Sequence, residues 1–172
     1  MIKPPRTLLE LFQSLPQRTL VQLIQNEIVI SPSPIDPHQL ILINLGSDMH
    51  VFVKQHKLGQ VRVAPSDVHL NNTYIYQPDI YFVSTKNLGS LKNNGFHGDP
   101  DLVVEILSPS TAKYDLEEKK DVYEQYEVKE YIIINPADKS VTVYELKNGM
   151  FEIYFTGVAK IESKLLATEF EF

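Results

Sequence analysis

Two carboxylates lie inside apolar stretches, where an unpaired charge is costly to bury. Glu105 lies in the run Leu102-Val-Val-Glu-Ile-Leu107, and Asp79 lies in Tyr76-Gln-Pro-Asp-Ile-Tyr-Phe-Val83. A carboxylate in such a place must be paired, protonated or bound to a metal ion. On neighbouring strands the two could share one Mg²⁺ or Mn²⁺ ion, because both ions prefer hard oxygen ligands. The alternative is that each is a structural carboxylate, satisfied near a strand end.

A predicted helix could add a cation to this pair. Successive helical positions rotate by about 100°, so one broad face contains Leu116, Lys119, Lys120, Tyr123 and Tyr126. A face of this kind normally covers a sheet. Lys119 or Lys120 would then point its ammonium toward the carboxylates and stabilise the charge that develops as a phosphodiester is attacked. The alternative is a lysine that extends along the face to the surface.

These residues resemble a nuclease signature. Pro78-Asp79, followed 26 residues later by Glu105, is similar to the PD-(D/E)XK pattern of restriction-endonuclease-like folds. A longer pattern resembles the Uma-two family of restriction-endonuclease-like proteins over about residues 20–146. The matching positions are Ser31-Pro-Ser-Pro34, His38-Gln39, Gly59, Ala64-Pro-Ser-Asp-Val68, Pro100–Thr111, Asp115, Lys119, Tyr123, Glu130-Tyr131 and Asn135-Pro136.

The resemblance implies a fold, a reaction and a site. The fold is α/β (mixed α+β) and restriction-endonuclease-like, with a central mixed β-sheet flanked by helices. The reaction is metal-dependent endonucleolytic hydrolysis of phosphodiester bonds in DNA, with Asp79 and Glu105 binding Mg²⁺ (or Mn²⁺) alongside the backbone carbonyl of Ile106. The superfamily lysine lies two positions after the glutamate, where this chain has Leu107. Lys119 matches the Uma-two lysine instead and would be the third catalytic residue.

Two further residues could assist the metal site. Glu27 matches the acidic residue of the family's early hairpin and would complete the metal shell, unless it is a solvated charge. His38 opens a long helix and would contact a phosphate or a metal-bound water, unless it simply lies at the surface. Gln22, Asn26 and Ile132 depart from the family, which usually has Glu, Gly and Trp there. Gln22 thereby removes a candidate acidic ligand.

Basic residues in two segments could contact the DNA backbone. The stretch Thr85–Gly98 is predicted to be an exposed, mobile loop, and its Lys86, Lys92 and His97 would contact phosphates. The second segment supplies Lys54, His56, Lys57 and Arg62.

The elements that position these residues follow from caps, breakers and periodicity. Thr7 and Glu10 form a capping box for a helix over about Leu8–Leu15, and Asp36 with Pro37 begins a helix that reaches about Gln55. Asp115–Glu118 caps a further helix to about Glu127. Strands are predicted at 20–24 and 27–30 around a Gln25-Asn26 turn, and at 61–64, 68–70, 74–83, 101–107, 131–134, 141–146 and 150–155, the last two joined at Asn148-Gly149. Ser31–Pro34 is predicted to be a loop. This order favours a mixed sheet with helices packed on it.

The composition limits the remaining choices. The chain has 172 residues and is predicted to be one domain, with residues 1–18 as an N-terminal helical extension. It contains no cysteine, which excludes thiolate metal sites, disulfides and a cysteine nucleophile. No apolar run is long enough to cross a membrane and none follows the start as a secretory signal would, so we expect a cytoplasmic protein. The formal charge of −6 argues against tight non-specific DNA binding.

Two other functions compete with the nuclease. A catalytically silent module that serves as a nucleic-acid or protein-interaction scaffold would bind no metal. In it, Lys119 would face solvent or pair only with Asp115 or Glu118. Sugar hydrolysis by the Asp/Glu pair is disfavoured because the chain has no tryptophan and no aromatic platform for a glycan. A homodimer would suit double-strand cutting, since two-fold symmetry is the commonest assembly.

Overall fold

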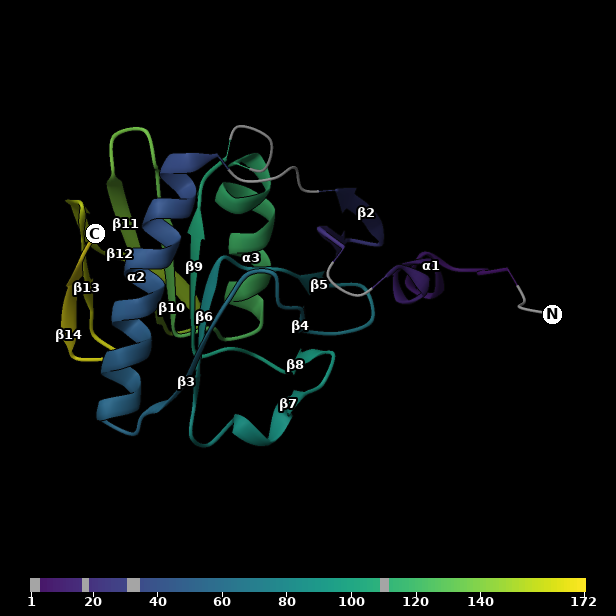
Figure 1. The fold of residues 1–172 in the computed structure, drawn as a ribbon, viewed down its shortest axis with the longest axis horizontal. Helices are drawn as coiled ribbons and strands as arrows, with labels where there is room; N and C mark the ends of the chain where they lie inside the picture. Colours follow the sequence, from purple (N-terminus) through teal and green to yellow (C-terminus); the bar gives the residue numbers. More distant parts are fainter. Residues whose placement is uncertain (1–3, 17–18, 31–34, 109–111) are drawn as a thin grey trace.

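One mixed β-sheet carries the predicted site. The computed structural model describes residues 4–16, 19–30, 35–108 and 112–172, and Figure 1 shows their arrangement. The central sheet has the strand order β12-β11-β10-β9-β6-β3. Its strands are β3 (Gly59–Val63), β6 (Ile80–Ser84), β9 (Leu102–Ile106), β10 (Glu130–Ile134), β11 (Ser140–Lys147) and β12 (Met150–Val158). β9 and β10 are parallel and the other neighbouring pairs are antiparallel, so the sheet is mixed.

Two helices cover opposite faces of the central sheet. α2 (Asp36–Gln55) packs Leu45 and Met49 against one face, in a cluster that includes Val104 of β9. α3 (Lys119–Gln125) packs Tyr123 against the other face, in a cluster that includes Val103. Successive strand residues point to opposite faces, which explains why neighbours on β9 join different clusters. The prediction of a mixed α/β fold with a central mixed sheet between helices is confirmed.

A second sheet extends from the central one, with the order β2-β1-β5-β4-β8-β7. Its strands are β1 (Val21–Ile24), β2 (Glu27–Ile30), β4 (Val68–His69), β5 (Ile75–Tyr76), β7 (Leu91–Lys92) and β8 (Gly95–His97). α1 (Leu8–Ser14) packs on it through the buried ring of Phe12. A C-terminal hairpin of β13 (Lys160–Ser163) and β14 (Thr168–Glu171) contacts α2.

Local sequence signals account for several of these elements. The side chain of Thr7 accepts a hydrogen bond from the Glu10 backbone N–H at 3.1 Å and caps α1. Gln25 and Asn26 both have positive φ, as a tight hairpin turn between β1 and β2 requires. Gly149 has a φ of +80° in the β11–β12 turn. None of the helices in the described ranges is both long enough and apolar enough to cross a bilayer.

Three boundaries differ from the sequence prediction. The stretch 74–83 is two strands in different sheets, because Pro78 cannot donate to a ladder. Asp36 is the first residue of α2 and not its cap, which is Ile35. Asp115 lies inside a π-helical turn, η2 (Tyr114–Glu118), and not at its N-cap, and its side chain is buried.

The predicted loop 85–98 is partly ordered secondary structure. It contains the 3-10 turn η1 (Leu88–Ser90), then β7 and β8, because the buried ring of Phe96 anchors β8 in a core cluster. β13 and β14 were not predicted. The predicted loop Ser31–Pro34 and residues 1–3 and 17–18 of the predicted extension lie outside the described residues.

Candidate active site

The two candidate metal ligands are neighbours at one end of the central sheet. Antiparallel pairing of Ile80 with Val104 places Asp79, the residue before β6, beside Glu105 near the end of β9. The backbone N–H of Ile106 donates to Asp79 Oδ2 at 2.7 Å. The strand register therefore brings together two carboxylates that are 26 residues apart in the chain.

Lys119 reaches this pair from α3. Its Nζ donates to Glu105 Oε1 at 3.0 Å and lies 2.8 Å from Asp115 Oδ1. Lys119 is only 2% exposed, as are Glu105 and Asp115. The hydroxyl of Tyr123 also donates to Glu105 Oε1, at 3.4 Å. One ammonium thus lies between two buried carboxylates.

This arrangement shifts the pKa values of both partners. Burial raises the pKa of Glu105 to about 8, although the charge of Lys119 opposes the shift. Burial lowers the pKa of Lys119, but the charges and hydrogen bonds of Asp115 and Glu105 outweigh it and raise that pKa overall. A single ammonium cannot compensate two buried carboxylates fully, so Glu105 holds a proton near neutral pH while Lys119 stays charged.

His38 contacts Asp79 from the first turn of α2. Its Nε2 lies 3.2 Å from both carboxylate oxygens of Asp79. Burial lowers the pKa of His38, yet the hydrogen bond and charge of Asp79 and a backbone hydrogen bond with Ile106 raise it overall. The Nδ1 atom of His38 is buried and has no hydrogen-bond partner among the described residues. His38 is therefore buried in the cluster and does not lie at the surface.

The donor set fits a hard divalent cation. No three His, Cys, Asp or Glu side chains within the described ranges are grouped closely enough to hold a metal by themselves. Mg²⁺ does not need such a group, because it keeps several waters and is usually bound through one or two carboxylates. Asp79 and Glu105 supply those two carboxylates, and the backbone of Ile106 lies against Asp79 and His38.

The structure does not bring the other predicted residues to this cluster. Glu27 is exposed on β2 of the second sheet. Lys86 follows the opposite end of β6 from Asp79, roughly 17 Å along a strand. Lys54 lies sixteen residues beyond His38, about 24 Å along α2. His56 and Lys57 follow it, and Arg62 lies on the edge strand β3, where it hydrogen-bonds locally to Val61 and Gln60.

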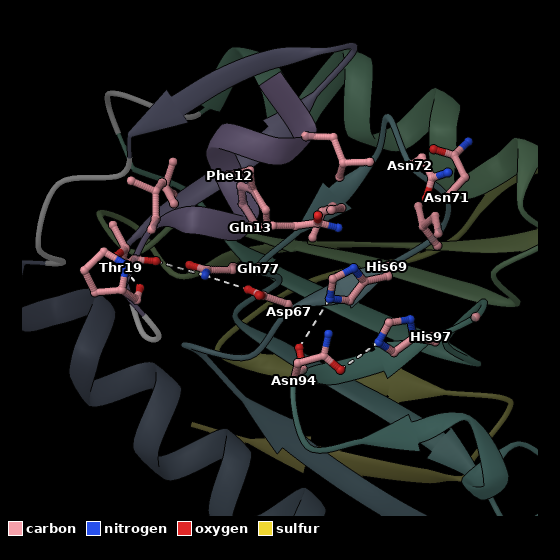
Figure 2. A pocket seen from close by; sticks show the side chains of 17 residues that line it. Phe12, Gln13, Thr19, Asp67, His69, Asn71, Asn72, Gln77, Asn94 and His97 are labelled. Carbon is pink, nitrogen blue, oxygen red and sulfur yellow. Dashed lines mark hydrogen bonds between the residues drawn. The ribbon is translucent and has the colours of Figure 1, made fainter. Parts of the chain in front are cut away.

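Lys92 and His97 belong to β7 and β8 of the second sheet. Figure 1 shows these strands at the bottom of the view, whereas β9 ends at the top beside the start of α2. Figure 2 shows His97 beside His69, and the two rings stack with centroids 4.2 Å apart. Both line a cavity of about 600 Å³ between α1 and the second sheet. Asp79, Glu105 and Lys119 do not line it.

Gln22, which departs from the family pattern, braces the segment before Asp79. Its Oε1 accepts a hydrogen bond from the Gln77 backbone N–H at 3.0 Å. The side chain of Gln77 in turn donates to Asp67 and to the Thr19 carbonyl, as Figure 2 shows. The neutral amide at position 22 therefore helps to hold the chain that leads into Pro78 and Asp79.

Three members of the cluster were not predicted as site residues. Asp115 pairs with Lys119, Tyr123 donates to Glu105, and the ring of Tyr76 lies 5.8 Å from Lys119 Nζ. The scaffold alternative names Asp115 as a possible partner of Lys119, and their spacing of four residues on a helix favours this pair. Nothing in the sequence indicates the contact with Tyr76, which comes from the second sheet.

Comparisons with known proteins agree with this architecture. The sequence model of the Uma2 family, described as "Putative restriction endonuclease", matches residues 9–171. A crystal structure from Anabaena variabilis, described as "a putative nuclease belonging to DUF820", superposes with a TM-score of 0.76 at 21% identity, over 95% of this chain and 92% of that one. No curated protein matches the sequence. Because the family match spans nearly the whole chain, this protein belongs to the Uma2 family.

Proposed function

We propose that the protein is a metal-dependent nuclease that hydrolyses phosphodiester bonds in DNA, with Asp79, Glu105 and Lys119 as its catalytic residues. One observation carries the proposal: a fully buried lysine ammonium lies 3.0 Å from Glu105, whose neighbour across the strand pair is Asp79. The family description and the nuclease-like fold of the Anabaena protein support the same reaction class.

In this mechanism Asp79 and Glu105 would hold Mg²⁺ or Mn²⁺, with the backbone carbonyl of Ile106. When bound, the ion supplies Lewis-acid activation of a water and of the phosphate. Glu105 must first lose the proton that its raised pKa favours. Lys119 keeps its charge because its pKa is raised, so it can donate to a phosphoryl oxygen and stabilise the developing negative charge.

His38 acts as a positioning residue in this mechanism. Its Nε2 and the Ile106 backbone N–H bind the carboxylate of Asp79 from two sides. Two such partners fix the rotamer of Asp79. Since the same carboxylate would bind the metal, protonated His38 and the metal compete for it.

The remaining interactions with DNA follow from the sequence prediction. Lys86, Lys92 and His97 would contact phosphates some distance along the duplex from the scissile bond. Lys86 follows the far end of β6 from Asp79, and Lys92 and His97 lie on β7 and β8 of the second sheet. Glu27 would take part only if the β1–β2 hairpin approaches the metal. We also propose a homodimer and a cytoplasmic location.

The scaffold alternative makes a geometric prediction that the structure does not favour. It expects Lys119 to face solvent or to pair only with Asp115 or Glu118. Lys119 is buried instead and donates to Glu105. A scaffold has no need of that contact, since burying three ionisable groups together is costly and adds little stability.

Plasmid cleavage tests the proposed function. Supercoiled DNA with Mg²⁺ or Mn²⁺ should be nicked by the wild-type protein, and Asp79→Asn or Glu105→Gln should lower the rate at least about 100-fold. Asp121→Asn, at an exposed carboxylate on α3, is the matched control and should keep full activity. Absence of cleavage by wild type, or full activity in Asp79→Asn, would contradict the proposal.

A further inference from the structure

The outer face of α2 carries an apolar stripe that no described element covers. Leu40, Ile43 and Val51 are 54%, 62% and 49% exposed. Together with Ser47 they recur at helical spacing on one side of the helix. The opposite side of α2 already buries its apolar residues in the core. Figure 1 shows α2 in the foreground with no element in front of it.

A groove beside the stripe extends the surface to the edge of the central sheet. β3 is the last strand of that sheet, and its Val63 is 44% exposed. Gly46 lets α2 approach β3 closely, because a Cβ there would lie 2.9 Å from Val63 Cγ1. The groove has a volume of about 560 Å³ and is lined by residues of α2 and β3, among them Ile43, Ser47, Val51 and Val63. A contiguous exposed apolar surface of this kind marks an interaction site.

The charges at the two ends of the stripe indicate what covers it. Asp36 lies at the start of the stripe and Lys54 at its end, both exposed and on the same side of α2. If two copies of α2 pack antiparallel about a two-fold axis at position 45, Asp36 meets the partner's Lys54 at both ends. The same axis places Ile43 against the partner's Ser47. Antiparallel packing also places the partly positive N-terminal end of each helix beside the partly negative C-terminal end of the partner's helix.

We propose that α2 and the groove beside β3 form a two-fold interface with a second copy of this chain. A surface that is complementary to itself under one rotation is what an isologous interface requires. From Leu40 to Val51 the stripe is about 17 Å long and about 10 Å wide, which is small beside the roughly 800 Å² per partner of a standard interface. The dimer is therefore reversible, and it does not depend on whether the protein cuts DNA.

Sedimentation velocity of the full chain tests this interface with a matched pair of variants. Wild type should shift from monomer to dimer as its concentration rises, and Ile43→Lys should stay monomeric. Ile153→Lys is the control, because Ile153 on β12 is equally exposed at 62% and lies outside the stripe. A wild-type monomer at every concentration, or equal effects of the two variants, would overturn the proposal.

Charge reversal tests the pairing of Asp36 with the partner's Lys54. Both residues are exposed, so neither substitution alters the core. Asp36→Lys alone sets Lys against the partner's Lys54, and Lys54→Asp alone sets Asp against the partner's Asp36. Each should weaken dimerisation roughly 3- to 10-fold. An equimolar mixture restores both opposite-charge pairs and should dimerise at least as tightly as wild type. A mixture that associates no better than either variant alone would overturn the antiparallel arrangement.

Discussion

Lys119 is buried, and the carboxylates of Glu105 and Asp115 balance its charge. Breaking a buried ion cluster by removing one member costs more than the cluster contributes as a whole, because the remaining charges lose their partner. Lys119 sits between Glu105 and Asp115 at 3.0 and 2.8 Å. Substitution of Lys119 should therefore lower the free energy of unfolding. This loss can be measured without any activity assay.

Replacing Lys119 by Met should lower the free energy of unfolding by about 3–5 kcal/mol at pH 8. The loss should be smaller at pH 5, because Glu105, whose pKa is raised to about 8, is then protonated and no longer needs a cation. Urea denaturation at both pH values measures the difference. Lys120→Met, at the half-buried neighbour, is the control and should cost much less at either pH. Equal losses for the two variants, or the same loss at both pH values, would contradict this account.

Glu105 should make the metal-free protein less stable as pH rises. Its pKa is about 8 in the folded state against an ordinary value of 4.5, so between these values the folded state holds a proton that the unfolded state has released. The free energy of unfolding should then fall by up to about 1.4 kcal/mol per pH unit across this range. Denaturation curves from pH 5 to 8 with EDTA should show this slope, and Glu105→Gln should flatten it. An unchanged slope in Glu105→Gln would mean that Glu105 does not titrate in this way.

The same proton would govern the proposed metal binding at Glu105. A carboxylate must be ionised to act as a ligand, so metal binding releases the proton. Mn²⁺ affinity should therefore rise by up to about tenfold per pH unit below pH 8. Calorimetry at pH 6.5 and 7.5, in buffers with different ionisation enthalpies, measures both the affinity and the released proton. A pH-independent affinity would refute this linkage.

At the scale of elements, β9 and β10 connect the candidate site to the rest of the fold. Both strands are buried throughout and pair in parallel from Leu102 to Ile106. At the other end of β10, Glu130 is buried and accepts hydrogen bonds from Ser163 Oγ and the Leu165 backbone N–H, at 2.6 and 2.7 Å. Burial raises the pKa of Glu130, although these bonds oppose the shift. Glu130 thus fastens the C-terminal hairpin to the central sheet.

Replacing Glu130 by Ala should loosen that hairpin selectively. The backbone N–H of Leu165 and the hydroxyl of Ser163 lose their acceptor, so amide exchange across β13 and β14 should accelerate while β9 stays protected. Hydrogen–deuterium exchange with mass spectrometry measures this. Glu171→Ala, at an exposed position on β14, is the control. Uniform acceleration in every strand would show that Glu130 supports the whole core and not the hairpin alone.

The sequence predicted those elements whose signals are local. The capping box at Thr7, the Gln25-Asn26 turn and the buried strand around Glu105 each depend on neighbouring residues, and each was found. β13 and β14 carry a weak signal, since Ile161 and Phe170 are their buried apolar residues. They form because Phe170 packs edge-on against Phe52 of α2, more than one hundred positions away.

The candidate site was predictable to a similar degree. Asp79 and Glu105 could be found from the sequence because a carboxylate in an apolar strand is costly to bury without a partner. The resemblance to a family then favoured Lys119 over Lys120. The contact between His38 and Asp79 spans 41 positions and depends on how α2 lies on the sheet. No local pattern encodes that packing. The π-helical turn that carries Asp115 is likewise set by the buried pair with Lys119 and not by a cap.

For the whole molecule, a formal charge of −6 means that the proposed DNA binding would rely on local basic groups. The Lys86→Ala/Lys92→Ala double variant should weaken duplex binding and lower the slope of log affinity against log salt by about 2. The cleavage rate of bound DNA should not change, because both lysines lie away from Asp79. Fluorescence anisotropy at several salt concentrations measures the slope, and single-turnover cleavage measures the rate. An unchanged slope would show that DNA crosses a different face.

The most direct test of the metal site is anomalous diffraction from wild-type crystals grown with Mn²⁺. We predict one anomalous peak between the carboxylates of Asp79 and Glu105, with oxygen ligands at about 2.1 Å and Lys119 within reach of the same site. Crystals that show no peak there, or show Mn²⁺ bound only elsewhere, would contradict the assignment of these residues as a nuclease centre.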